Sequence, residues 1–318
     1  MPSDHPPTAE PKLIIIMGAT GSGKSTFANL ATGADFRVGH GLQSCTETIQ
    51  QETLQLDNEV VTIIDTPGFD DTERPQADVL REIADFLKAE YENKTKVAGV
   101  VFTYRISDHR MSGVSLENYR LFRKICGDMA MENVAVVTTM WTSSNQTVGM
   151  RREKELSTNF FKDAIENNAR MYRHDNTQES AKTILRDLMG RKSGALRVQV
   201  ELVDQHKSIP ETEAGTQLQS ALDEEEKRHN EKLEEIERER QRLLSERESS
   251  KEKILQEMET ERRVVQDRLS KVLSEKEKLR FMRANNAEKI QTPQVVVSAA
   301  PASESEPERP WWRRLCCF

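Results

Sequence analysis

The chain has little cysteine, no long apolar run and no uninterrupted basic tract. Four cysteines occur in 318 residues, and none has the spacing of a metal-ligand set. We therefore expect no disulfide framework and a reducing compartment. No apolar stretch is long enough to span a bilayer, and the N-terminal residues lack the basic and apolar regions of a signal peptide. The net charge of −7 gives no reason to expect nucleic-acid binding.

The composition divides the chain into parts. Hydrophobic residues make up only 36% and charged residues 31%, so some of the chain must lie outside a packed core. Pro-containing residues 1–11 resemble a disordered leader, and residues 12–207 a folded domain. Residues 208–217 resemble a linker, and residues 218–285 are dominated by Glu, Lys, Arg and Gln. Residues 286–318 are predicted to be a disordered tail.

The folded part alternates β-like and helical segments, which is typical of a parallel sheet flanked by helices. The predicted strands are enriched in Val and Ile, as strands buried on both faces should be, and they span residues 13–17, 60–64, 97–103 and 134–138. The predicted helices span residues 25–31, 77–91, 115–126, 154–167 and 179–189, the last followed by Gly190 as a C-cap. The predicted fold class is therefore α/β.

A phosphate-binding loop follows the first predicted strand. Its sequence fits G-x-x-x-x-G-K-[ST] between a strand and a helix, where its amides and the helix dipole can hold phosphate oxygens. Lys24 would reach the β- and γ-phosphates, and the Ser25 hydroxyl would ligate Mg²⁺. The predicted nucleotide-binding residues here are Gly18, Ala19, Thr20, Gly21, Ser22, Gly23, Lys24, Ser25 and Thr26.

A second motif, D-x-x-G, ends the strand that precedes residue 65. Asp65 stands at the carboxyl end of that strand, where it can hold Mg²⁺ through water, and the Gly68 amide can sense the γ-phosphate. Between the two motifs, Thr46 and Thr48 are both candidates for the threonine that orders a switch loop in the triphosphate state. The combination favours a GTPase-like switch over a nucleotide kinase.

These motifs resemble a known family. The loop at 18–25, Ser44-x-Thr46, the stretch Asp65-Thr66-Pro67-Gly68-Phe69 and residues 104–127 are similar to the immune-associated nucleotide-binding (GIMAP-like) GTPases, relatives of septins and of the chloroplast Toc receptors. The Thr-Met-Trp sequence of this chain, which follows the predicted strand at 134–138, resembles that of a set of fungal G-domain proteins. The resemblance implies a Ras-like doubly wound P-loop G domain, GTP with Mg²⁺, and dimerisation across the G-domain face. It also selects Thr46 rather than Thr48 as the switch threonine. The predicted catalytic residues are then Lys24 and Thr46, and the predicted metal-binding residues are Ser25, Thr46 and Asp65.

The chain departs from better-known GTPases at two positions. Where guanine is read by an [NT]-K-x-D box, Thr139 stands at the first position and Thr142 at the Asp. A hydroxyl cannot replace a bidentate carboxylate, so discrimination of GTP from ATP should be weaker. Trp141 either stacks on the base or lies in the core. Phe69 replaces the Gln that orients the attacking water, which predicts slow intrinsic hydrolysis.

Several other polar residues are candidates near the nucleotide. Arg105 and Arg110 follow the predicted strand at 97–103 and could serve from a dimer partner, or they are surface arginines. His174 and Asn176 fall where the last base-contacting loop belongs, or they only shape a turn.

The C-terminal third predicts a long helix and a membrane anchor. Met258, Val265, Val272 and Leu279 recur every seventh residue, with Leu255 and Leu269 completing an a/d seam that Arg262 and Lys276 interrupt. Ile236 and Leu243 belong to another register, which implies a stutter near Ser249. We expect a self-associating coiled coil; a solvated single helix is the alternative. The last residues carry two Trp, two Arg and adjacent Cys316 and Cys317, candidates for lipidation, unless they are unmodified thiols.

The sequence thus predicts a cytoplasmic GTP-binding switch with slow, dimer- or partner-assisted hydrolysis, tethered to the cytosolic face of a membrane. Its predicted partners are GTP or GDP, a second copy through the G domain or coiled coil, and a membrane, but no nucleic acid. Two alternatives remain open: a non-hydrolysing nucleotide-dependent scaffold and a P-loop ATPase.

Overall fold

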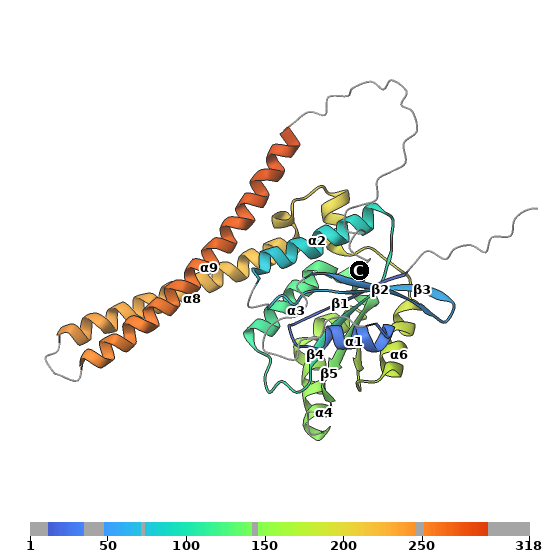
Figure 1. Ribbon diagram of the computed structural model, residues 1–318, viewed down its shortest axis with the longest axis horizontal. Helices are drawn as coiled ribbons and strands as arrows, with labels where there is room; N and C mark the ends of the chain where they lie inside the picture. The colour runs from blue at the N-terminus through green and yellow to red at the C-terminus, as the bar shows by residue number, and fades with distance from the viewer. Residues whose placement is uncertain (1–11, 35–47, 71–73, 142–145, 246–250, 292–318) are drawn as a thin grey trace, which may run out of the picture.

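The protein is an α/β domain with a helical hairpin attached to it (Figure 1). The computed structural model describes residues 12–34, 48–70, 74–141, 146–245 and 251–291. The predictions for Thr46, Thr142, Cys316 and Cys317 lie outside the described residues. Over the described residues, no helix is both long enough and apolar enough to cross a membrane.

One six-stranded sheet forms the centre of the domain. The strand order is β2-β3-β1-β4-β5-β6, and every neighbouring pair is parallel except β2 with β3. The strands are β1 (Lys12–Gly18), β2 (Gln50–Leu56), β3 (Glu59–Asp65), β4 (Val97–Arg105), β5 (Val134–Thr139) and β6 (Arg170–Arg173). The four strands predicted from apolar runs are confirmed. The two outer strands were missed, because β2 is mostly polar and β6 has four residues.

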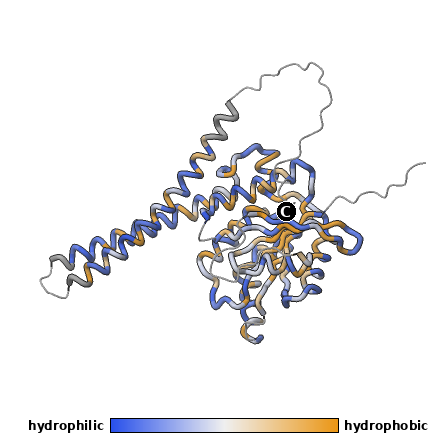
Figure 2. The backbone as a smooth tube through the Cα atoms, viewed as in Figure 1, coloured by the Kyte–Doolittle hydropathy of each residue, from blue (hydrophilic) through white to orange (hydrophobic). Residues whose placement is uncertain are grey.

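The strands are apolar on consecutive positions because helices cover both faces of the sheet. In β1, Ile15 and Met17 pack into one core with residues of α2 and α3, whereas Ile14 and Ile16 pack into the other core with α1 and α6. All four are at most 1% exposed. Figure 2 shows the apolar strands gathered in the domain, in contrast to the mostly hydrophilic hairpin. The doubly wound α/β prediction is therefore confirmed.

The helices around the sheet are α1 (Lys24–Thr32), α2 (Gln76–Glu92), α3 (Gly113–Cys126), α4 (Gln146–Glu155), α5 (Lys162–Glu166), α6 (Gln178–Met189) and α7 (Arg197–Gln199). The ranges predicted for α1, α2, α3 and α6 are confirmed to within two residues, whereas α7 was not predicted. The single helix predicted over 154–167 is instead the end of α4, a π-helical turn at Leu156–Phe160 and α5. The break brings Phe161 into the core, where it packs edge-on against Phe102 and Tyr104.

The stretch predicted as a linker is folded. A 3-10 turn at Ile209–Glu211 precedes α8 (Glu213–Ser245), and Pro210, Thr212 and Ala214 are buried. The Glu211 carboxylate accepts hydrogen bonds from the amide and the hydroxyl of Ser208, at 2.9 and 2.6 Å. This local capping was not recognised because Pro, Thr and Gly in the stretch are equally typical of a linker.

The charged C-terminal region forms two antiparallel helices, α8 and α9 (Lys251–Gln291), that lie side by side (Figure 1). Their direction follows from two ion pairs, Lys276 with Asp223 and Lys232 with Glu261. The helical prediction is confirmed. The heptad residues Val265, Val272 and Leu279 are at most 6% exposed, so these positions are buried within one chain rather than against a second copy, and Lys276 in the seam is neutralised from α8.

The hairpin also contacts the start of α2. Lys278 forms an ion pair with Asp78 at 2.7 Å, and the Glu275 carboxylate accepts hydrogen bonds from the amides of Gln76 and Ala77. These amides lie at the N-terminus of α2, which has Pro75 as its N-cap and no side-chain cap of its own. Glu275 therefore supplies from α9 the acceptor that α2 lacks.

Candidate functional site

The phosphate-binding loop joins β1 to α1 at the carboxyl edge of the sheet. Gly23 is the N-cap of α1 and adopts a left-handed conformation with φ of 94°. A residue with Cβ is strained there, which explains glycine at this place. The first amides of α1 therefore face the loop, as an anion site requires.

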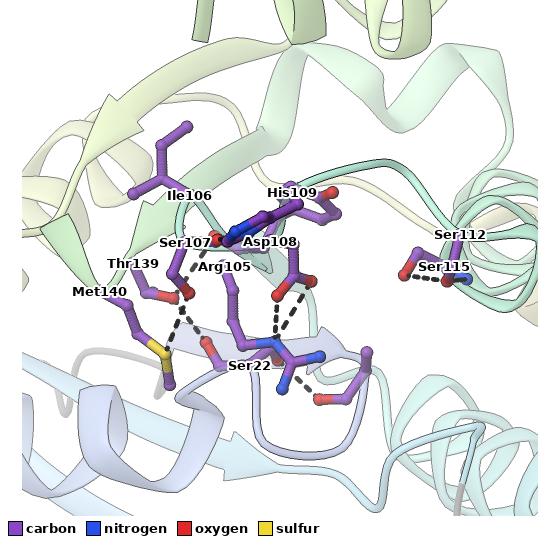
Figure 3. A network of polar contacts seen from close by, with 12 residues as sticks. Ser22, Arg105, Ile106, Ser107, Asp108, His109, Ser112, Ser115, Thr139 and Met140 are labelled. Carbon is purple, nitrogen blue, oxygen red and sulfur yellow. Dashed lines mark hydrogen bonds and ion pairs between the residues drawn. The ribbon is translucent and has the colours of Figure 1, made fainter. Parts of the chain in front are cut away.

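Three side chains hold the loop in shape. The Ser22 hydroxyl donates to the Ala19 carbonyl at 2.7 Å and also contacts the Thr103 hydroxyl of β4 at 2.6 Å. On the other side, the Thr139 hydroxyl donates to the Ser22 carbonyl at 2.8 Å (Figure 3). Because β4 and β5 each contribute one contact, the sheet itself fixes the curvature of the loop.

Lys24 and Ser25, the predicted phosphate and metal ligands, lie in the first turn of α1. Lys24 is 6% exposed and its ammonium donates to the Ala19 carbonyl at 3.0 Å, folding back over the loop. The Ser25 hydroxyl donates to a carboxylate oxygen of Asp65 at 2.6 Å, and Asp65 is fully buried at the end of β3. Thr26 is half-buried in the first turn of α1.

The Ser25 and Asp65 oxygens suit Mg²⁺. This ion prefers hard oxygen ligands and is usually held in such sites by one or two protein side chains together with substrate phosphates. A hydroxyl and a carboxylate that already lie within hydrogen-bond distance provide that pair of oxygens next to the phosphate loop. The residues present therefore fit the ion.

The segment after Asp65 lies directly on the phosphate loop. A Cβ atom on Gly68 would be 2.3 Å from the Thr20 hydroxyl and 2.7 Å from the Thr20 amide nitrogen, so only glycine fits. The Asp70 carboxylate accepts a hydrogen bond from the Thr20 amide, with 2.5 Å between nitrogen and oxygen. Sequence reasoning missed Asp70, although a carboxylate two residues after Gly68 was the available signal.

Phe69 points away from this arrangement. Its side chain is 1% exposed and packs in the main core with residues of α2 and β4. A buried phenyl ring cannot orient a water molecule. The position of Phe69 is therefore consistent with the predicted slow intrinsic hydrolysis.

Arg105 lies over the outer side of the loop (Figure 3). A Cβ atom on Gly21 would be 3.4 Å from one of its terminal nitrogens, and Asp108 holds the guanidinium through its Nε at 3.1 Å. Arg152 of α4 holds the backbone that follows Arg105, because its guanidinium donates hydrogen bonds to the carbonyls of Ile106 and Ser107. Arg110 is exposed and lines a hollow of about 360 Å³ beside Arg152.

Thr139 and Trp141, the two residues predicted to lie near the nucleotide base, make different contacts. Thr139 is buried and is engaged with the phosphate loop. The Trp141 ring nitrogen donates to the Thr138 carbonyl at 3.1 Å, and the Arg173 guanidinium lies over the ring, 4.6 Å from its centroid. The indole is half-buried with its edge against Gly149, and the Arg173 guanidinium covers one of its faces.

His174 belongs to the core. It is 3% exposed, its ring packs edge-on against Phe27 of α1, and its Nδ1 contacts the Ser180 hydroxyl at 3.1 Å. Burial lowers the pKa of His174. Asn176 has a left-handed backbone with φ of 65°, as in a turn. The turn-shaping alternative therefore describes this loop better than a base contact.

Several solved structures are similar to part of this chain. Toc33 from Arabidopsis thaliana in complex with Mg²⁺ and GMPPNP is 16% identical, with a TM-score of 0.47, over 58% of this chain and 88% of that chain. The complex of Toc33 with GDP and Mg²⁺ is also 16% identical, with a TM-score of 0.46, over 58% and 87%. A structure reported for the dimerisation and GTPase activity of the chloroplast translocon components atToc33 and psToc159 is 12% identical, with a TM-score of 0.48, over 58% and 86%.

The family assignment comes from the sequence itself. Residues 12–237 match the AIG1 family, and this range includes the phosphate loop, Asp65, Gly68 and the whole sheet. The match spans more than half of the 318 residues. The chain therefore belongs to the AIG1 family of G-domain proteins.

Proposed function

We propose that the protein binds GTP with Mg²⁺ and hydrolyses it slowly, with assistance across a G-domain homodimer. The observation that carries this proposal is the Ser25 hydroxyl held 2.6 Å from the buried Asp65 carboxylate, beside Lys24 in the phosphate loop. Membership of the AIG1 family supports it.

Binding would exchange internal contacts for contacts to phosphate. The Lys24 ammonium would leave the Ala19 carbonyl and pair with the β- and γ-phosphates, and the loop amides would donate to phosphate oxygens. Ser25 and Asp65 would hold Mg²⁺, which neutralises charge that develops on the phosphoryl group. Thr46, outside the described residues, would complete the site from the first switch.

Slow hydrolysis follows from the residues near the γ-phosphate. Phe69 is buried and orients no water, so a polar group must come from elsewhere. Arg105 is the candidate that a second copy would supply, because it is held by Asp108 at the rim of the loop with its side chain 36% exposed. A guanidinium in that role stabilises charge in the transition state.

Single-turnover hydrolysis across a range of protein concentrations tests the enzyme proposal. We expect a rate that rises with protein concentration in the wild type and stays low in Arg105→Ala. Arg120→Ala is the matched control, since Arg120 is exposed on α3 and pairs with Glu117. If GTP binds but the hydrolysis rate stays at background at every concentration, the result would instead support the non-hydrolysing nucleotide-dependent scaffold. The burial of Phe69 also favours that alternative.

Two finer proposals need their own tests. Weak selection for guanine follows from Thr142, and competition of ATP against bound GTP measures it; equal affinities would favour the ATPase alternative. Tethering to a membrane rests on the sequence of the tail alone. Flotation of the full chain with lipid vesicles, compared with a Cys316→Ser/Cys317→Ser variant, tests it, and equal flotation would remove the anchor.

A further inference from the structure

The phosphate loop already holds an anion of the protein's own. The Asp70 carboxylate accepts the Thr20 amide hydrogen at 2.5 Å, across 50 residues of sequence. Amides of such a loop are the groups that donate to phosphate oxygens. One of these donors is therefore committed to a carboxylate.

The contact lies at the γ-phosphate end of the loop. Thr20 is near the start of the loop, whereas the amides that begin α1 lie at its other end. Gly68, whose amide is the predicted γ-phosphate sensor, sits directly on Thr20, with its Cβ position 2.7 Å from the Thr20 nitrogen. A third phosphate would thus arrive where Asp70 now sits, whereas a diphosphate would end before it.

Two anions cannot share this position at low cost. A carboxylate and a phosphate oxygen competing for one amide hydrogen repel each other, and the repulsion grows where the surroundings exclude water. Thr20 is half-buried and its hydroxyl, packed under Gly68, has no partner among the described residues. The segment from Gly68 to Asp70 must therefore move before a triphosphate can seat fully.

We propose that Asp70 is a specificity-determining residue of the phosphate site: its carboxylate competes with the γ-phosphate for the Thr20 amide and so favours diphosphate over triphosphate. This inference rests on the proposed binding of guanine nucleotides. On this inference, triphosphate binding displaces Gly68–Asp70 from the loop, because the γ-phosphate repels the Asp70 carboxylate that now contacts Thr20.

The test compares affinities for GDP and for GTPγS, both with Mg²⁺, in the full chain. We expect Asp70→Ala to bind GTPγS about tenfold more tightly, with GDP affinity changed less than threefold. Tenfold equals about 1.4 kcal/mol, close to the low end for a hydrogen bond to a charged group. Asp70→Asn keeps the acceptor oxygen without the charge, so it should gain about threefold.

Glu117→Gln is the matched control. It removes one negative charge from a half-buried position on α3, where Glu117 pairs with Arg120, and it should leave both affinities unchanged. Thermal melting of each variant verifies folding. A GTPγS-to-GDP affinity ratio that is the same in wild type, Asp70→Ala and Asp70→Asn overturns this inference and leaves the proposed function standing. A wild type that binds neither nucleotide overturns both.

Discussion

Substitutions at buried and exposed leucines of α9 can distinguish a hairpin within one chain from a coiled coil between two chains. Leu279 is 2% exposed and packs in the main core of the domain, whereas Leu273 on the same helix is 41% exposed. We expect Leu279→Ala to weaken the docking of α9 strongly and Leu273→Ala to have almost no effect. The two variants change the same side chain in the same helix, so helix propensity cancels.

The size of the effect follows from burial. Leu→Ala at a fully buried position costs about 2–5 kcal/mol, and at an exposed position within about 0.5 kcal/mol. If α9 opens as a unit, a loss of about 3 kcal/mol reduces its amide-exchange protection roughly 100-fold. Amides of β1 and β4 should keep their protection, because they belong to the sheet.

Amide hydrogen exchange followed by mass spectrometry measures this directly. It should be performed at two protein concentrations at least tenfold apart. Protection of α9 that is independent of concentration agrees with burial within one chain. The reasoning is refuted if Leu279→Ala and Leu273→Ala lose equal protection, or if protection of α9 in the wild type rises with concentration, as an intermolecular seam would require.

Three further predictions concern single side chains. Ser25→Ala should weaken triphosphate binding about 100-fold in Mg²⁺ and little in EDTA, since it removes the hydroxyl paired with Asp65; equal losses in both would contradict a metal role. Burial lowers the pKa of His174, so the unfolded chain binds the extra proton and stability should fall as pH decreases below about 6.5; urea titrations should show this slope in the wild type and not in His174→Gln. Burial, together with Glu225, raises the pKa of Glu275, so the folded chain binds the extra proton and stability should fall as pH rises above about 4.5; Glu275→Gln should remove that fall, and parallel curves would argue against it.

Much of the sheet could be predicted because its signal is local. Apolar residues on consecutive positions mark β1, β3, β4 and β5, since each is buried on both faces. The antiparallel β2 carries no such run, because it lies at the edge of the sheet and is exposed along much of its length. The break between α4 and α5 could not be predicted either, because residues 154–167 have a continuous helical pattern. The break depends on the packing of Phe161 against Tyr104 in the core, which is a tertiary contact.

The sequence by itself determined that this protein has a phosphate loop, two candidate metal ligands in Ser25 and Asp65, and a long charged helical region. Those features are encoded by neighbouring residues, and their chemistry depends on residue type and spacing. Only the tertiary structure decided that Asp70 meets Thr20, that Phe69 faces the core, and that the heptads of α9 face α8. The physical reason is that residue type and spacing determine which interactions a heptad or a carboxylate can form. Which distant segment lies close enough to form them depends on how the whole chain folds.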